Sequence, residues 1–410
     1  MSVAAKTRFA GRVAAPAYGV CLALLVGLAL APATMGAAPP PAGRAMWVWY
    51  LSRSDGGNVA ALAAQAHAEG VGSVFVKSAD GTNVWAQFTP ALVATLHADG
   101  LHVCAWQYVY GSDPYGEAQA ALSAIRDDGA DCLIIDAEAE YEGRYAAAQE
   151  YLHTIRAAVG PGYPLALAPF PFADEHPSFP YSVFLGPGGA QFDLPQMYWN
   201  LIGESPAAVF RRTYTDLRIY RRMILPVGQT FGPVSAFDVE IFRGLAVRYG
   251  APGISWWDFA WTSADTLWPA VGAPWMPPGP VSTLGYPVLR VGTSGDEVLW
   301  LQEHLAARYS AQRLTGLFGD ETEHFLEAFQ AAHRLPVSGL TDAATWRALL
   351  RVRPVTVAWA ASAASARASP APSHLDAPPA SAFLHDRGAE LPELGSNRTA
   401  PAARLADPGA

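Results

Sequence analysis

Two carboxyl side chains follow a short apolar run in the middle of the chain. Asp136 and Glu138 come directly after residues 132–135, Cys-Leu-Ile-Ile, a run that predicts a buried strand. Residues two apart on a strand point to the same side, so both carboxyl groups should project together from its carboxyl end. Neighbouring carboxylates repel, which raises the pKa of one and keeps a proton on it near neutral pH. Such a pair can protonate a leaving oxygen, as glycosidases require.

Glu140 and Glu142 continue the acidic alternation beyond this pair. They lie further from the apolar run, and an exposed acidic loop is the better interpretation for them, because unpaired charged side chains belong at the surface. Asp136 and Glu138 follow the run directly, and for these two a functional site is the better interpretation.

Further candidates lie near the ends of other apolar runs. Gln196 and Tyr198 alternate within Leu-Pro-Gln-Met-Tyr-Trp and therefore share a side of the predicted strand. Tyr198 can donate a hydrogen bond to the acetamido oxygen of a sugar, although a tyrosine packed inside the molecule fits the same pattern. We take both residues as candidates for substrate binding.

Tryptophan is abundant, with 13 residues among 410, and its flat face suits sugar rings as well as a core. Trp256 and Trp257 are adjacent in the last apolar run, so one of them must face inward, and Trp257 is the candidate that would support a sugar. Asp258 follows Trp257 and is a further acid or a structural partner of Lys77. We take both Asp258 and Lys77 as candidates for substrate binding.

A weaker aromatic signal lies in residues 102–110, His-Val-Cys-Ala-Trp-Gln-Tyr-Val-Tyr, which predict a strand. Trp106 is the candidate sugar-binding residue of this run, and Gln107 and Tyr108 are further possibilities beside it.

Short apolar runs alternate with amphipathic segments from residue 44 to residue 271, which predicts a parallel sheet covered by helices. Eight repeats in about 225 residues fit a closed (β/α)8 TIM barrel, whose catalytic groups lie at the carboxyl ends of the strands. An open nucleotide-binding sheet is a distant second, because no phosphate-binding glycine loop follows the first run. The predicted strands span residues 44–51, 73–77, 102–110, 132–136, 165–170, 192–199, 223–229 and 253–259.

The start of the chain is typical of an export signal. Lys6, Arg8 and Arg12 precede an apolar run at residues 20–30, and small residues and prolines follow. This pattern predicts a signal peptide over residues 1–38 and a secreted or wall-associated protein. An uncleaved anchor is the alternative, but the run is about half of the ~20 residues that a spanning helix needs. We therefore expect no stable membrane span after cleavage.

Composition also divides the rest of the chain. Residues 272–287 are rich in Pro and Gly and predict a linker, and residues 360–410, rich in Ala, Ser and Pro, predict a disordered tail. Cys21 lies in the leader, whereas Cys104 and Cys132 fall on neighbouring predicted strands. Two buried thiols are the default expectation there, and a disulfide formed after export is the alternative.

Residues 288–352 predict a small domain of three helices that contains a short internal repeat. The repeated turns and helix starts are Gly316-Leu317-Phe318-Gly319 with Thr322, and Gly339-Leu340-Thr341 with Thr345. This region resembles the three-helix peptidoglycan-binding domain of bacterial wall enzymes. The resemblance implies that it binds peptidoglycan or another cell-wall polysaccharide.

The first half of the barrel resembles the lysozyme-type glycoside hydrolases of family 25. Three motifs carry the resemblance, namely Lys77-Ser78-Ala79-Asp80-Gly81, Gly100-Leu101-His102-Val103 and Asp136-Ala137-Glu138. It implies that Glu138 is the general acid and that Asp136 orients an acetamido group or stabilises the charged intermediate. The family usually has an acidic residue at the end of the first strand, where the nearest candidate in this chain is Asp55.

Composition narrows the function further. Hydrophobic residues make up 51% and charged residues 15%, which excludes wholesale disorder, and a net charge of −9 disfavours a nucleic-acid partner. No histidine pair or Asp-rich loop has metal-ligand spacing, so no metal or cofactor is expected.

The sequence therefore predicts a secreted hydrolase of cell-wall glycan that its C-terminal domain tethers to the substrate. A non-catalytic glycan-binding barrel at the wall is the alternative, favoured by the missing acid after the first strand. An amidase or peptidase is disfavoured, because no metal set and no Ser–His or Cys–His pair stands out.

Overall fold

The structure is a computed structural model that describes residues 43–262, 265–274 and 284–360. The expected signal peptide at residues 1–38 lies outside the described residues, as does nearly all of the expected tail at 360–410. Part of the expected linker at 272–287 is also outside them. Among the residues described, no helix is long and apolar enough to cross a membrane.

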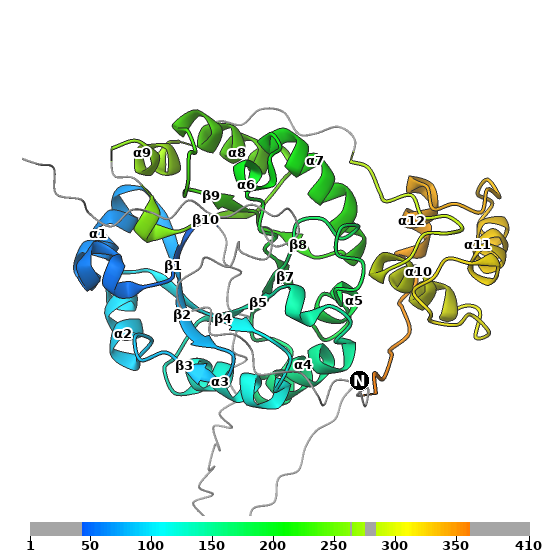
Figure 1. Cartoon of the computed structure of the whole chain (residues 1–410), viewed down its shortest axis with the longest axis horizontal. Helices are drawn as coiled ribbons and strands as arrows, with labels where there is room; N and C mark the ends of the chain where they lie inside the picture. The colour runs from blue at the N-terminus through cyan, green and yellow to red at the C-terminus, as the bar shows by residue number, and fades with distance from the viewer. Residues whose placement is uncertain (1–42, 263–264, 275–283, 361–410) are drawn as a thin grey trace, which may run out of the picture. The chain divides into compact units, whose positions relative to one another are not determined.

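The described strands form one sheet that confirms the predicted (β/α)8 architecture (Figure 1). Its order is β8-β7-β6-β5-β4-β2-β1-β10-β9, with all these neighbours parallel, and β3 (Asn83–Val84) pairs antiparallel with β2. The parallel strands are β1 (Gly43–Val48), β2 (Val71–Asp80), β4 (His102–Val109), β5 (Cys132–Ala137), β6 (Leu165–Ala168), β7 (Phe192–Asp193), β8 (Met223–Ile224), β9 (Val227–Gln229) and β10 (Gly253–Trp257).

The ends of this strand order meet, so the sheet closes into a barrel. Strands β8 and β9 are two parts of one extended run, interrupted at Leu225 and Pro226. The chain after β7 pairs with this run, because Met197 N donates to Val227 O at 2.9 Å and Val227 N donates to Pro195 O at 3.0 Å. The predicted strand at 192–199 is shorter than expected. The regular strand ends at Asp193, Pro195 has no N–H to donate, pairing continues only as an isolated bridge at Gln196, and a helix begins at Trp199.

Helices connect the strands and lie outside the ring that they form (Figure 1). Several begin at a side chain that accepts a backbone N–H of the first turn, as Asn58, Thr89, Asp113, Ser205 and Ser235 do. The helices are α1 (Val59–Ala68), α2 (Pro90–Ala98), α3 (Pro114–Arg126), α4 (Tyr145–Val159), α5 (Tyr181–Phe184), α6 (Trp199–Ile202), α7 (Pro206–Asp216), α8 (Ala236–Arg248) and α9 (Leu267–Gly272).

Alternation along the strands divides the core in two. One buried cluster lies between strands and helices, and a second fills the barrel with inward side chains such as Trp47, Phe75, Trp106, Ile134 and Trp257. The inner cluster is unusually aromatic: the Trp47 ring meets those of Trp106 and Trp257 at centroid distances of 5.6 and 5.4 Å. Large rings therefore fill the space that branched aliphatic side chains commonly fill in such barrels.

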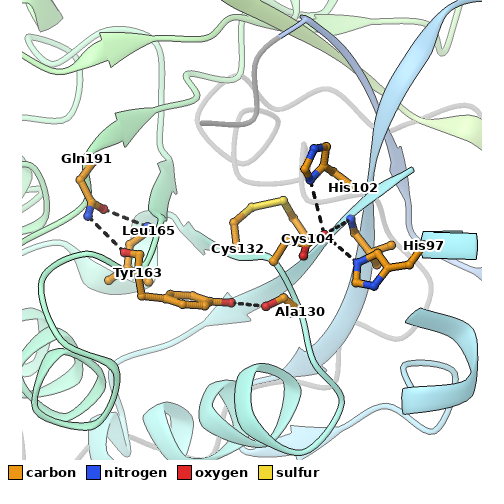
Figure 2. Close-up of a disulfide and its surroundings, with 10 residues drawn as sticks. His97, His102, Cys104, Ala130, Cys132, Tyr163, Leu165 and Gln191 are labelled. Atoms are coloured by element: carbon orange, nitrogen blue, oxygen red, sulfur yellow. Dashed lines mark hydrogen bonds and ion pairs between the residues drawn. A yellow bond between two sulfur atoms is a disulfide. The ribbon is translucent and has the colours of Figure 1, made fainter. Parts of the chain in front are cut away.

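Cys104 and Cys132 form a disulfide, which corrects the default expectation of two buried thiols (Figure 2). They are direct partners on the parallel strands β4 and β5, and their Cα atoms are 4.6 Å apart. Both side chains belong to the inner cluster, so the pleat directs the two sulfur atoms to the same side of the sheet. Shared register and shared direction together bring the thiols within bonding reach.

The C-terminal helices α10 (Asp296–Ala306), α11 (Asp320–Ala332) and α12 (Ala343–Leu349) confirm the predicted three-helix domain. Its internal repeat rests on two glutamines, Gln302 and Gln330. The Gln302 amide accepts from Thr315 N and Gly316 N and donates to Thr322 Oγ1. In the second unit, the Gln330 amide accepts from Ser338 N and Gly339 N and donates to Thr345 Oγ1. Each glutamine thus ties one turn to the start of the next helix.

Helix α10 contacts the barrel through buried polar and aromatic groups. The Asp296 carboxylate accepts hydrogen bonds from Ser182 N at 2.8 Å, Ser182 Oγ at 2.7 Å and the Tyr220 hydroxyl at 2.8 Å. The Trp300 indole N–H donates to Ile219 O at 2.9 Å. Asp296 and Trp300 are buried by this contact, and each would lose a hydrogen-bond partner without it.

Candidate active site

The catalytic candidates lie where β5 ends. Asp136 is on β5 and Glu138 follows it immediately, and both side chains are fully or almost fully buried. Other candidates come from other strands of the barrel: Lys77 from β2, Trp106 from β4 and Trp257 from β10. Because all these strands are parallel, their carboxyl ends meet at one end of the barrel, which is where such barrels carry their active sites.

A glutamine amide bridges the two carboxyl groups. Gln196 Nε2 lies 3.2 Å from Asp136 Oδ1 and 2.9 Å from Glu138 Oε1, and 3.3 Å from the backbone oxygen of Ala168. Glu138 Oε2 and Gln196 Oε1 are buried and have no hydrogen-bond partner in the described part of the chain. A buried carboxyl oxygen without a partner is costly in a resting core and is common where a ligand binds.

The electrostatics of the pair differ between its members. Burial raises the pKa of both carboxyl groups. The Lys77 ammonium opposes this rise at Asp136, where it is the largest charge effect, whereas at Glu138 the charge of Asp136 raises the pKa further. Asp136 is therefore the better placed of the two to carry the negative charge, and Glu138 is the better placed to hold a proton at neutral pH.

Lys77 lies inside an aromatic box. Its ammonium donates to Asp80 Oδ2 at 2.6 Å and lies 4.7 and 4.6 Å from the ring centroids of Trp85 and Trp106. Burial lowers the pKa of Lys77, and Asp80 is the main group that opposes this. The structure thus pairs Lys77 with Asp80, where the sequence suggested Asp258 as one possibility.

Asp258 instead caps a short helix that follows β10. Its carboxylate accepts from Trp261 N at 3.3 Å and so begins a short 3-10 helix, η5 (Phe259–Trp261). Burial raises the pKa of Asp258 to about 7 although backbone N–H groups oppose the rise. The group can therefore change its charge near neutral pH, but its visible partners are backbone amides.

The aromatic candidates separate according to which way they face. Trp257 belongs to the inner cluster, and its indole nitrogen is buried without a partner in the described residues. Trp256 belongs to the cluster between strands and helices, so it is excluded from the barrel interior. Trp106 and Tyr198 also face inward, and Trp106 donates its indole N–H to Val48 O at 3.2 Å.

Gln107 is a weaker candidate that the structure removes from the site. It is wholly buried outside the barrel, where its amide donates to Gly81 O and Glu117 O and accepts from the Tyr151 hydroxyl. The alternation of the strand explains this, since its neighbours Trp106 and Tyr108 face inward. Gln107 holds a helix against the sheet.

Two hydrogen bonds near the carboxylate pair could not be read from the sequence as site features. Tyr110 donates its hydroxyl to Asp80 Oδ1 at 2.7 Å, and Tyr108 donates its hydroxyl to Glu140 Oε2 at 2.8 Å. Glu140 is only partly exposed, in contrast to the expected acidic loop. Asp80 could have been found from the sequence, because it belongs to the motif that begins at Lys77. Asp55, the nearest acid after the first strand, is exposed in a 3-10 turn.

No cluster of three or more His, Cys, Asp or Glu side chains suited to a metal ion occurs in the described ranges. The groups gathered at the barrel end are carboxyl, amide, ammonium and aromatic side chains. This set suits acid catalysis on a neutral, ring-shaped substrate.

Residues 294–349 match the family described as "Putative peptidoglycan binding domain". No curated protein matches the chain. Among solved structures, the catalytic domain of a hyperthermophilic chitinase from Pyrococcus furiosus is similar with a TM-score of 0.44 and 13% identity, over 58% of this chain and 95% of that chain. The endo-β-1,4-mannanase of Thermotoga petrophila gives a TM-score of 0.42 and 10% identity, over 53% and 68%. A class V chitinase from Pseudomonas fluorescens gives 0.41 and 11%, over 56% and 98%.

Proposed function

We propose that this protein is a glycoside hydrolase that cleaves a cell-wall glycan, either peptidoglycan or a related N-acetylated polysaccharide. The observation that carries the proposal is the bridged pair of buried carboxyl groups at the end of β5, in which Glu138 Oε2 has no partner in the described residues. The C-terminal match to a peptidoglycan-binding family supports the choice of substrate. A wall-binding domain would also raise the local concentration of the enzyme on an insoluble glycan.

The proposed reaction uses Glu138 as the proton donor. As the bond between the anomeric carbon and the glycosidic oxygen breaks, Glu138 transfers its proton to that oxygen and becomes a carboxylate. Asp136 is the neighbouring anion that stabilises positive charge on the sugar. Water then adds to the anomeric carbon and returns a proton to Glu138, which restores the starting state.

Substrate assistance is the proposed route where the sugar carries an N-acetyl group. In the described residues no further carboxylate is placed as a nucleophile, and the acetamido oxygen can attack the anomeric carbon instead. Asp136 would then orient and stabilise the acetamido group, and the inward-facing Tyr198 would donate its hydroxyl to the acetamido oxygen. Trp257, Trp106, Lys77 and Asp258 remain candidates for sugar contacts or for shaping the site.

We also propose that the protein acts outside the cytoplasm, after removal of residues 1–38. The disulfide between Cys104 and Cys132 supports this, because such bonds persist in oxidising compartments and are rare in the cytosol. The expected partner is wall polysaccharide and not nucleic acid.

A non-catalytic glycan-binding barrel is the second candidate function. The observation that favours it is the exposed position of Asp55, the nearest acid after β1, where the resembled hydrolases usually have an acidic residue at the end of the first strand. The two functions predict different outcomes in a single assay.

The test is release of reducing ends from purified peptidoglycan by wild-type protein and by Glu138→Gln. Loss of a general acid typically lowers the rate by ~10²–10⁴, so the variant should be almost inactive. Retention in a pellet with insoluble peptidoglycan should be the same for the two proteins, because the C-terminal domain is unchanged, and equal melting temperatures show that the variant is folded. A Glu138→Gln rate above half of the wild-type rate excludes the assigned role. No release of reducing ends by the wild type, together with binding by the barrel, supports the second function.

A further inference from the structure

We propose that Gln196 is a positioning residue that determines which oxygen of Glu138 carries the proton, and not a group that binds substrate. The inference rests on the proposed function, since it assigns Gln196 a part in the same acid catalysis. It departs from the role that the sequence suggested for Gln196, because the side-chain N–H groups are directed at the two carboxyl groups.

The orientation of the Gln196 amide follows from its neighbours. Three atoms lie within 3.3 Å of Nε2, and all three are oxygens that accept hydrogen bonds: Asp136 Oδ1, Glu138 Oε1 and Ala168 O. Turning the amide over would place its carbonyl oxygen against the backbone oxygen of Ala168 and the carboxylate of Asp136, which is unfavourable at both. Nitrogen must therefore face the carboxyl groups.

The backbone around Gln196 is fixed on both sides. Gln196 N donates to Pro169 O at 3.0 Å, next to β6, and the following residue, Met197, donates its N–H to Val227 O at 2.9 Å, on β9. Gln196 is 2% exposed, so its side chain has little freedom to turn away. A donor held from two strands is preorganised, which is what an acid group needs if its geometry is to survive substrate binding.

The two oxygens of Glu138 consequently have different tasks. Oε1 accepts a hydrogen bond from Gln196, and the oxygen that carries a proton is a poorer acceptor than the carbonyl oxygen of the same group. The proton therefore belongs on Oε2, which is buried and has no partner in the described residues. Oε2 is the atom that would face the glycosidic oxygen.

Gln196→Met keeps the approximate size of the side chain and removes both donors. We expect kcat to fall by about tenfold or more while KM changes little, because Glu138 loses its orientation and the substrate loses no contact. The hydrogen bond from Gln196 lowers the pKa of Glu138, so its loss raises that pKa. Activity needs protonated Glu138 and is lost as pH rises through its pKa, so the alkaline limb of the kcat profile should move up by about one pH unit.

Gln107→Met is the matched control. Gln107 is also a wholly buried glutamine of the barrel, but its amide faces a helix and not the carboxyl groups. This variant should lower thermal stability without moving the alkaline limb. If Gln196→Met does not fold, Gln196→Asn tests the same point, because the shorter side chain withdraws the donor from both carboxyl groups.

A second readout separates this proposal from the proposed function. The carbonyl stretch of protonated Glu138, identified by its absence in Glu138→Gln, can be followed by infrared spectroscopy as pH rises, with no substrate present. The midpoint should be higher in Gln196→Met than in wild type, and unchanged in Gln107→Met. An unchanged midpoint in Gln196→Met overturns the positioning role even if the enzyme is active. A shifted midpoint in a protein that cleaves no glycan supports the hydrogen bond and rejects the hydrolase.

Discussion

Lys77 distinguishes two carboxyl groups that the sequence presents as equals. Asp136 and Glu138 are both buried, but the lysine charge acts mainly on Asp136. The Lys77 ammonium is itself held by Asp80, whose other oxygen accepts the Tyr110 hydroxyl. Burial raises the pKa of Asp136 to about 8, and Lys77 is the group that opposes this rise, whereas Asp80 adds to it.

Replacing Lys77 tests this assignment. The acid limb of the kcat/KM profile reports ionisation of Asp136, and Lys77 lowers the pKa of that group. In Lys77→Met the pKa of Asp136 should rise, so the acid limb should move to higher pH by about 1–3 units, the usual effect of one neighbouring charge. Lys77→Arg keeps a cation and is the control. An acid limb that stays in place in Lys77→Met would show that Lys77 does not set the charge of Asp136.

The sequence identified the groups at the carboxylate pair better than the contacts among them. Alternation after an apolar run was enough to predict that Asp136 and Glu138 share a side, and that Gln196 and Tyr198 share a side of another strand, because side-chain direction in a strand has a period of two. The hydrogen bond from Tyr110 to Asp80 could not be predicted from alternation. It depends on the register between two strands, and the sequence of either strand alone does not determine that register. Gln107 shows the opposite case, in which alternation alone would have removed a candidate.

Helices and strands were predictable where residues that begin or end an element are easy to recognise. Helices that begin at Asn58, Thr89 or Ser205 follow capping residues that can be read directly. The strand predicted at 192–199 was too long because an aromatic-rich run looks extended. The regular strand stops at Asp193, Pro195 has no N–H to donate, and only an isolated bridge at Gln196 follows. The disulfide was not the default expectation, because two cysteines on adjacent strands can bond only if they are direct partners, and the pairing register cannot be derived from either strand alone.

The disulfide should stabilise the barrel. It joins two residues 28 positions apart, and closing a loop of that size in the unfolded chain is worth about 3–4 kcal/mol in the chain-entropy description. Cys104→Ser should therefore lower the melting temperature markedly, and reducing agent should lower that of the wild type by a similar amount. Titration of thiols in unfolded, unreduced protein is the check. Two reactive thiols from Cys104 and Cys132 would contradict the bond.

Buried acids shape the stability of the whole molecule. Burial raises the pKa of Asp216 to about 8, that of Asp296 to about 6 and that of Glu303 to about 9. Each native pKa lies above the unfolded value, so the native state binds more protons than the unfolded one. The stability that these groups contribute is complete below about pH 4 and is lost as pH rises through the native values.

The full chain should therefore melt at a higher temperature at pH 5 than at pH 8. Asp216→Asn removes one of the titrating groups, and it should narrow that difference by about 5–10 °C. Asp127→Asn, at an exposed position of the barrel surface, is the matched control and should leave the difference unchanged. Calorimetry at the two pH values decides the matter. Equal melting temperatures for wild type at both would show that these acids are not buried in solution.

The C-terminal domain is the part of the molecule that the sequence described most completely. Its repeat was visible in the spacing of Gly, Leu and Thr, and the structure gives the spacing a cause in the paired bonds of Gln302 and Gln330. The contact of Asp296 and Trp300 with the barrel was not visible, because their partners are a short helix and a backbone carbonyl far away in the sequence.

The central claim is that Glu138 donates a proton to the leaving group, and the dependence of rate on the leaving group tests it most directly. Wild type and Glu138→Gln should be compared on an N-acetylated oligosaccharide and on its aryl glycoside, whose acidic phenol leaves without a proton. We expect the variant to lose ~10²–10⁴ in kcat on the sugar leaving group and less than about tenfold on the phenol. Equal losses on both substrates would show that Glu138 is not the proton donor.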